Sequence, residues 1–148
     1  MIQKNKIGII GCGWLGLPLA KLLLKKKYSI KGSTTSKEKL PILQNHKISP
    51  YLIEINESEI KGDIDSFIMD LDILIVNIPP KIKSIPKSKY SKKIESLNNL
   101  IKTNSVKKIL FISSTSVYGS DQGKIDSNTV PKPNSKSGLE ILKSEKIL

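Results

Sequence analysis

Apolar and polar positions alternate along the chain in blocks that predict strands and helices in turn. Short apolar runs, as expected of strands covered on both faces, cover residues 6–10, 29–33, 51–55, 72–78 and 108–113. Helical spacing of apolar residues follows Gly16 and recurs over residues 37–45, 60–69, 90–103 and 138–148. This order predicts an α/β protein of the Rossmann type, with a parallel sheet, helices on both faces and right-handed crossovers.

A glycine motif follows the first predicted strand directly and opens the first helix. It reads Gly11-x-Gly13-x-x-Gly16. Gly11 permits the tight turn, Gly13 leaves room for a pyrophosphate, and Gly16 lets the helix pack closely. The exposed amides and positive dipole at the helix start favour phosphate. The motif therefore predicts dinucleotide binding. The competing interpretation, a secretory signal, fits poorly with three glycines at this spacing.

Composition narrows the classes of partner. The formal net charge is +12, but every basic residue is lysine and the lysines are spread along most of the chain. We interpret the charge as a solvated surface and expect no specific nucleic acid. No apolar stretch reaches the about 20 residues of a membrane span, so we expect no membrane contact. One cysteine, Cys12, fits a cytoplasmic protein, and with His46 as the single histidine we expect no metal site.

The end of the second predicted strand bears on the choice of cofactor. NAD-binding proteins usually carry an acid there, which holds the ribose 2′-hydroxyl, and counting from Gly16 places it at Thr34. The hydroxyls of Ser33, Thr34 and Thr35 with the ammonium of Lys37 suit a 2′-phosphate instead. The sequence therefore favours NADP over NAD. The alternative is an ordinary Ser/Thr turn that caps the next helix.

A second motif, Phe111-Ile-Ser-Ser-Thr-Ser-Val-Tyr-Gly119, closes the fifth predicted strand. With the glycine motif it makes the chain resemble the extended or atypical short-chain dehydrogenase/reductase family. That is the NAD-dependent epimerase/dehydratase group, and the YeeZ-like branch is the most similar. The resemblance covers essentially the whole chain as the N-terminal part of such a protein. It implies one NAD(P)-binding Rossmann domain over residues 1–148, truncated before the substrate lobe.

The resemblance also implies roles for individual residues. Gly11, Gly13 and Gly16 match the pyrophosphate turn, and Trp14 and Leu15 supply amides at the helix start. Asn77 and Pro79 match the place where the family sets backbone beside the cofactor ribose and adenine. Ser114 matches the serine or threonine that hydrogen-bonds the substrate carbonyl or hydroxyl. The implied partners are a nicotinamide dinucleotide and a small molecule, either a nucleotide sugar or a carbonyl compound.

The chain departs from the family at its catalytic pair. Active members use Tyr-x-x-x-Lys on the helix after the fifth strand, where lysine lowers the pKa of the tyrosine. Ser137 stands in the tyrosine place and Ile141 in the lysine place. Two interpretations stay open. The chain is either an oxidoreductase or epimerase-like enzyme, or a non-catalytic NAD(P)-binding sensor or regulatory module.

Overall fold

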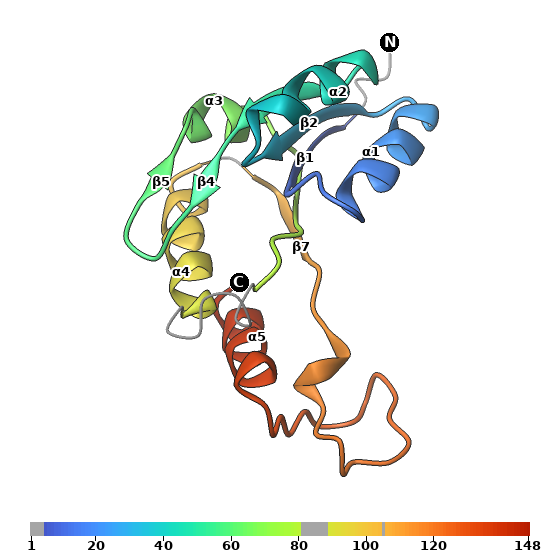
Figure 1. Cartoon of the computed structure of the whole chain (residues 1–148), viewed down its shortest axis with the longest axis vertical. Coiled ribbons are helices and arrows are strands. Elements are labelled where there is room, and N and C mark those ends of the chain that lie inside the picture. Colours follow the sequence, from blue (N-terminus) through green and yellow to red (C-terminus); the bar gives the residue numbers. More distant parts are fainter. Residues whose placement is uncertain (1–4, 81–88, 105) are drawn as a thin grey trace.

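The computed structural model describes residues 5–80, 89–104 and 106–148, and its centre is a five-stranded parallel sheet (Figure 1). The strands are β1 (Lys6–Ile10), β2 (Ser29–Thr34), β3 (Ser49–Leu52), β6 (Ile73–Val76) and β7 (Lys108–Phe111). Their order across the sheet is β3-β2-β1-β6-β7. In the register of the central strand, Ile9 lies between Gly32 and Ile75. The predicted α/β fold of the Rossmann type is confirmed.

Helices cover both faces of the sheet, because side chains on a strand alternate between its two faces. On one face, Ile7 and Ile9 of β1 pack in a core with Ala20 and Leu43. Ala20 belongs to α1 (Gly16–Lys25) and Leu43 belongs to α2 (Leu40–Asn45). On the other face, Ile10 belongs to a core shared by α3 (Ile64–Ile68), α4 (Tyr90–Ile101) and α5 (Lys136–Ile147).

The segment predicted as a helix over residues 60–69 is only half helical. Ile60–Lys61 forms β5, which pairs antiparallel with β4 (Glu54–Ile55), and α3 begins after it. Gly62 ends the strand with φ of 102°, and a Cβ there would fall on the carbonyl oxygen of Leu52. Asp63 then caps the helix, accepting a hydrogen bond from the Ser66 amide at 3.1 Å. Local turn chemistry therefore overrides the apolar spacing that suggested a longer helix.

Other boundaries shift by a few residues. β3 begins and ends earlier than the predicted run over residues 51–55, whose end forms β4. The predicted strands 72–78 and 108–113 shorten to β6 and β7, although Asn77 and Ile112 each donate one further backbone bond at 2.9 Å. Short 3₁₀ turns, η1 (Lys37–Lys39) and η2 (Thr115–Val117), precede α2 and follow β7. α5 starts at Lys136 rather than residue 138, because Ser135 accepts a bond from the Gly138 amide.

The strand order places a switch point between β1 and β6. The chain proceeds from β1 outward to β2 and β3, and from β6 outward to β7 in the opposite direction. Loops at the carboxyl ends of β1 and β6 therefore part and leave a crevice, which is where open α/β sheets bind ligands. Within the described residues, every helix is too short or too polar to cross a bilayer.

Candidate functional site

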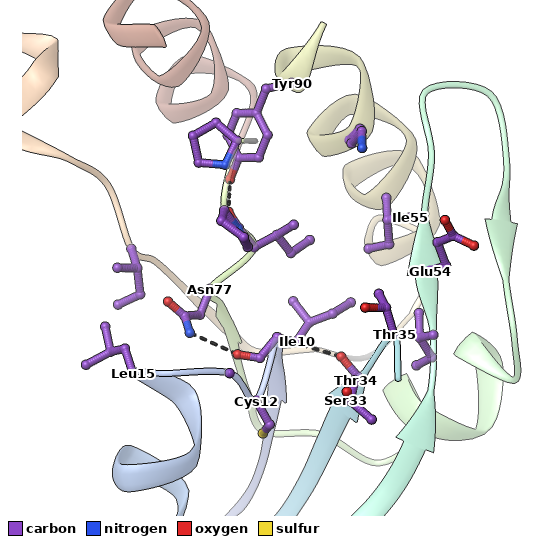
Figure 2. Close-up of a pocket in the computed structure, with 18 of the residues that line it drawn as sticks. Ile10, Cys12, Leu15, Ser33, Thr34, Thr35, Glu54, Ile55, Asn77 and Tyr90 are labelled. Atoms are coloured by element: carbon purple, nitrogen blue, oxygen red, sulfur yellow. Dashed lines mark hydrogen bonds between the residues drawn. The ribbon is translucent and has the colours of Figure 1, made fainter. Parts of the chain in front are cut away.

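A cleft of about 710 Å³ opens at this switch point (Figure 2). Its walls come from the carboxyl ends of β1, β2, β6 and β7, from β4, and from α4 and α5. Most of the predicted site residues line it: Gly11, Gly13, Trp14, Leu15, Ser33, Thr34, Thr35, Asn77, Pro79 and Ser114. Gly16 and Lys37 are outside the cleft wall. The fold therefore brings together residues that are far apart in the sequence.

The glycine turn is held in place from two neighbouring strands. The Gly11 amide donates to the Ser33 hydroxyl at 3.0 Å, and its carbonyl accepts from Asn77 Nδ2 at 2.9 Å. Figure 2 shows Ser33 and Asn77 approaching the turn from opposite sides. Gly11 has φ of 99°, and a Cβ there would fall on the Asn77 carbonyl oxygen. Glycine is thus required here by both conformation and space.

Gly13 and Gly16 serve different purposes in the same turn. A Cβ on Gly16 would strike the Gly11 carbonyl oxygen, so this glycine allows the helix to approach the turn. A Cβ on Gly13 would meet nothing within 4 Å, because that position faces the open cleft. Among the described residues, no acceptor faces the backbone N–H groups of Trp14 and Leu15. An open cradle with two free amides at a helix start fits a pyrophosphate.

The hydroxyls at the end of β2 are partly engaged by the protein itself. Ser33 is buried and accepts the Gly11 amide, while the Thr34 hydroxyl accepts the Ser36 amide at 3.2 Å. Thr34 therefore forms a Ser/Thr turn, but among the described residues no side chain caps the next helical turn, η1, as the alternative interpretation expected. The side chain that brings positive charge to this wall is Lys39, two residues beyond the predicted Lys37.

Ser114 is exposed in the cleft and oriented by the turn that follows β7. Its oxygen accepts two hydrogen bonds, from the Ser116 amide at 3.2 Å and from the Ser116 hydroxyl at 3.0 Å. With both lone pairs engaged, the hydroxyl hydrogen of Ser114 is free to be donated to an external oxygen. The neighbouring Ser113 also lines the cleft, but its hydroxyl donates to the Glu145 carboxylate. The two serines therefore differ in what they can offer a ligand.

The helix that carries the positions of the missing catalytic pair, α5, packs against this serine turn. Gly138 packs so tightly on η2 that a Cβ there would strike the Ser116 carbonyl oxygen. Ile141 is buried and contributes an apolar side chain to the cleft wall in the lysine place. Tyr90, on α4, also lines the cleft, but its hydroxyl donates to the Ile78 carbonyl at 2.7 Å and burial raises its pKa. Tyr90 is therefore a poor proton donor.

Sequence reasoning missed several polar residues of the cleft, among them Lys39, Glu54, Asn56 and Lys93. Glu54 and Asn56 arrive through the β4–β5 hairpin, which replaced a predicted strand end and a predicted helix. Lys93 lies on the side of α4 that turns toward the cleft. Apolar periodicity identified that helix but carried no information on which lysine faces a ligand. Within the described residues, no group of three or more potential metal ligands comes together.

Cys12 lies inside the turn but is shielded from solvent. Its side chain is 3% exposed, and its amide donates to the Ser33 carbonyl at 2.7 Å. Burial raises the pKa of the thiol to about 12, outweighing the lowering by a backbone hydrogen bond at Ser33. A thiol with this pKa is almost wholly protonated near neutral pH. Cys12 therefore serves as a small packing residue.

This geometry defines a domain of the Rossmann type with an open cleft at its switch point, and comparison with known proteins gives its relatives. No family model matches the chain. Protein YeeZ of Escherichia coli K12 is 32% identical over 136 residues, which cover 90% of this chain and 49% of YeeZ. An uncharacterized UDP-glucose epimerase of Bacillus subtilis, YtcB, is 28% identical over 158 residues, covering 96% of this chain and 50% of YtcB. Both are homologues of this chain, which spans about half the length of either.

Solved structures show the same fold. The UDP-glucuronic acid 4-epimerase of Bacillus cereus, in complex with UDP-glucuronic acid and NAD, superposes with a TM-score of 0.75 at 23% identity. The match covers 96% of this chain and 50% of the epimerase. The resemblance to the N-terminal part of epimerase and short-chain dehydrogenase/reductase proteins, stated from the two sequence motifs, is confirmed.

Proposed function

We propose that this chain is the NAD(P)-binding domain of an epimerase/dehydratase-type oxidoreductase. The observation that carries the proposal is the open side of the glycine turn. Gly13 presents bare backbone to a cleft of about 710 Å³, with the N–H groups of Trp14 and Leu15 beside it. When bound, the nicotinamide cofactor supplies hydride transfer. The chain itself binds the phosphates and orients the reactants.

We propose NADP as the preferred cofactor. The end of β2 carries no carboxylate, and Thr34 and Thr35 line the cleft there together with Lys39. A 2′-phosphate meets no repulsion from that strand end, and it gains a nearby ammonium. Lys37, the cation that the sequence predicts at the 2′-phosphate, lies outside the cleft wall, and its contact with the phosphate stays a prediction.

The proposed substrate is a nucleotide sugar or another carbonyl or alcohol compound. Ser114 lies in the same cleft as the glycine turn, and its free hydroxyl hydrogen suits donation to a substrate oxygen. Asn77 and Pro79, at the carboxyl end of β6, form the wall between the turn and the serine motif. This substrate class is supported by the names of YtcB, a UDP-glucose epimerase, and of the structurally similar UDP-glucuronic acid 4-epimerase.

A second candidate function is a non-catalytic NAD(P)-binding sensor or regulatory module. It is favoured by the place of the missing pair, because Ile141 faces the cleft where a lysine would assist a tyrosine. Tyr90, a tyrosine that lines the cleft, does not replace the missing one, because its hydroxyl donates to the Ile78 carbonyl. Neither serine nor isoleucine replaces a phenol–ammonium pair in proton transfer.

Titration with NADPH and NADH, followed by nicotinamide fluorescence, tests the proposal. We expect both to bind, NADPH more tightly, and failure of both would overturn cofactor binding altogether. Ser114→Ala should leave cofactor affinity unchanged and lower turnover of a UDP-sugar about 100-fold or more, as for loss of an oxyanion donor. Ser127→Ala, an exposed serine in the loop before α5, is the matched control. Cofactor binding without turnover by the wild-type chain would favour the sensor or regulatory function over the enzymatic one.

A further inference from the structure

An apolar surface lies on the outer side of the first two helices. We define the α1–α2 face by its exposed apolar residues Trp14, Leu15, Pro18, Leu22 and Ile42. Trp14 is 92% exposed, Leu22 51% and Ile42 45%. A fully exposed tryptophan amid further apolar groups is unusual on the surface of a monomer, and tryptophan is enriched among residues that dominate binding energy.

The face is hollowed between the two helices. A groove of about 300 Å³ runs there, lined mainly by apolar side chains of Trp14, Leu17, Pro18, Ile42 and Leu43, with Lys39 at its edge. It is separate from the interior of the cofactor cleft, although Cys12, Gly13, Trp14 and Lys39 border both hollows. A groove of this kind accommodates an apolar side chain of a partner. Amphipathic helices commonly bind in this way, with their apolar side in a hydrophobic groove.

The charge around this face is of one sign. Lys21 and Lys25 alternate with Pro18 and Leu22 on the exposed side of α1, and Lys39 borders the groove. Residues 1–53 contain one carboxylate side chain, that of Glu38, which already accepts the Ser36 hydroxyl. Salt bridges between described residues involve other lysines. The apolar face is thus rimmed by ammonium groups without a carboxylate partner in the described part of the chain.

We propose that the α1–α2 face docks an acidic amphipathic segment of a partner protein. The partner's apolar side chains would fill the groove and cover Trp14, and its carboxylates would meet Lys21, Lys25 and Lys39. Complementary charge of this kind raises association rates and excludes wrong partners. A second copy of this chain is disfavoured, because a symmetric contact would bring the same lysines together. The proposed surface shares Trp14 and Lys39 with the border of the cofactor cleft, whereas Leu17, Pro18, Ile42 and Leu43 line the groove alone.

The emission of Trp14, the single tryptophan of the chain, provides the test. The probe is a synthetic amphipathic helix with leucine on one side and glutamate on the other. We expect a saturable shift of Trp14 emission to shorter wavelength. Leu22→Ser combined with Ile42→Ser should raise the Kd about tenfold or more, whereas Val130→Ser, at an even more exposed apolar site elsewhere, should leave it unchanged.

Three results would overturn the proposal. The first is an unmoved Trp14 emission with the acidic peptide, and the second is an equal shift with a peptide carrying lysine in place of glutamate. The third is a shift with phosphatidylglycerol vesicles but not with the acidic peptide, which would assign the face to an anionic lipid surface. Binding of NADPH by the Leu22 and Ile42 variant, measured separately, shows whether the proposed cofactor function holds independently.

Discussion

Two glycines of the same turn should respond in opposite ways to the same substitution. Gly11→Ala places a Cβ against the Asn77 carbonyl oxygen in a residue with φ of 99°. The conformation costs about 1–2 kcal/mol and the overlap about 1–3 kcal/mol, so we expect a loss of roughly 2–5 kcal/mol. In a chain of 148 residues this lowers Tm by roughly 5–20 °C.

Gly13→Ala should leave the stability of the cofactor-free protein almost unchanged. Its φ lies outside the positive range, and an added Cβ meets nothing within 4 Å. Alanine at such a position stabilises by about 0.4–1 kcal/mol, through the entropy of the unfolded chain. The larger Gly13→Val fills the space reserved for phosphate. Loss of one charge-assisted hydrogen bond, about 1.5–3 kcal/mol, should raise the Kd for NADPH roughly 10- to 100-fold.

Thermal unfolding without cofactor and fluorescence titration with NADPH measure the two effects separately. The reasoning fails if Gly13→Ala destabilises the fold as much as Gly11→Ala does, because the two glycines would then share one structural role. It also fails if Gly13→Val binds NADPH as the wild type does, since the phosphates would then lie elsewhere. Circular dichroism of each variant establishes that the folded protein is being compared.

Three further outcomes are expected. Cys12 should resist thiol reagents at pH 8 in the folded protein and react only as it unfolds, because burial raises its pKa to about 12; rapid labelling of native protein would contradict this. Burial raises the pKa of Glu140, but hydrogen bonds from Ser91 and Lys143 outweigh it and lower the pKa overall. Its stabilisation is therefore present above the ordinary carboxyl pKa and lost as pH falls through the lower folded value. Glu140→Gln should cost roughly 1 kcal/mol at pH 7 and less near pH 3, as urea unfolding at both pH values would show; an equal difference at both would refute it. Finally, saturating NADPH should lower the affinity for the acidic peptide, because both ligands compete for Trp14 and Lys39. By linkage the peptide should lower the affinity for NADPH by the same factor, and isothermal titration in both orders checks this.

The sequence was sufficient for the fold because its signals there are local. Ile7, Ile9 and Ile10 on one short strand, followed by Gly11, fix a buried strand that ends in a turn. Where the prediction was wrong, two adjacent turn residues decided the outcome: Gly62 and Asp63 convert the start of a predicted helix into a hairpin and a cap. Apolar spacing carries little trace of such a turn, so element type was predicted better than element boundaries.

The site was only partly predictable, because its walls depend on contacts across the sheet. Motif spacing found Gly13 and Ser114, which lie next to strand ends. Lys39 and Lys93 reach the cleft from helices, and the direction of a helical side chain follows from packing that the sequence does not state. Sequence reasoning also could not show that the Thr34 hydroxyl oxygen already accepts a hydrogen bond from the Ser36 amide.

The hydrogen bonds of the cleft separate the scaffold from the groups left for a ligand. Ser33, Asn77 and Tyr90 line the cleft, yet each has a polar atom bonded to backbone of the turn or of the chain after β6. The N–H groups of Trp14 and Leu15 and the hydroxyl hydrogen of Ser114 have no such internal partner among the described residues. These donors lie on two different walls of one cleft, so a ligand that satisfies both must present an anionic group and a second oxygen some distance apart. The phosphates of a dinucleotide would supply the anionic group, and a carbonyl or alcohol substrate beside it would supply the second oxygen.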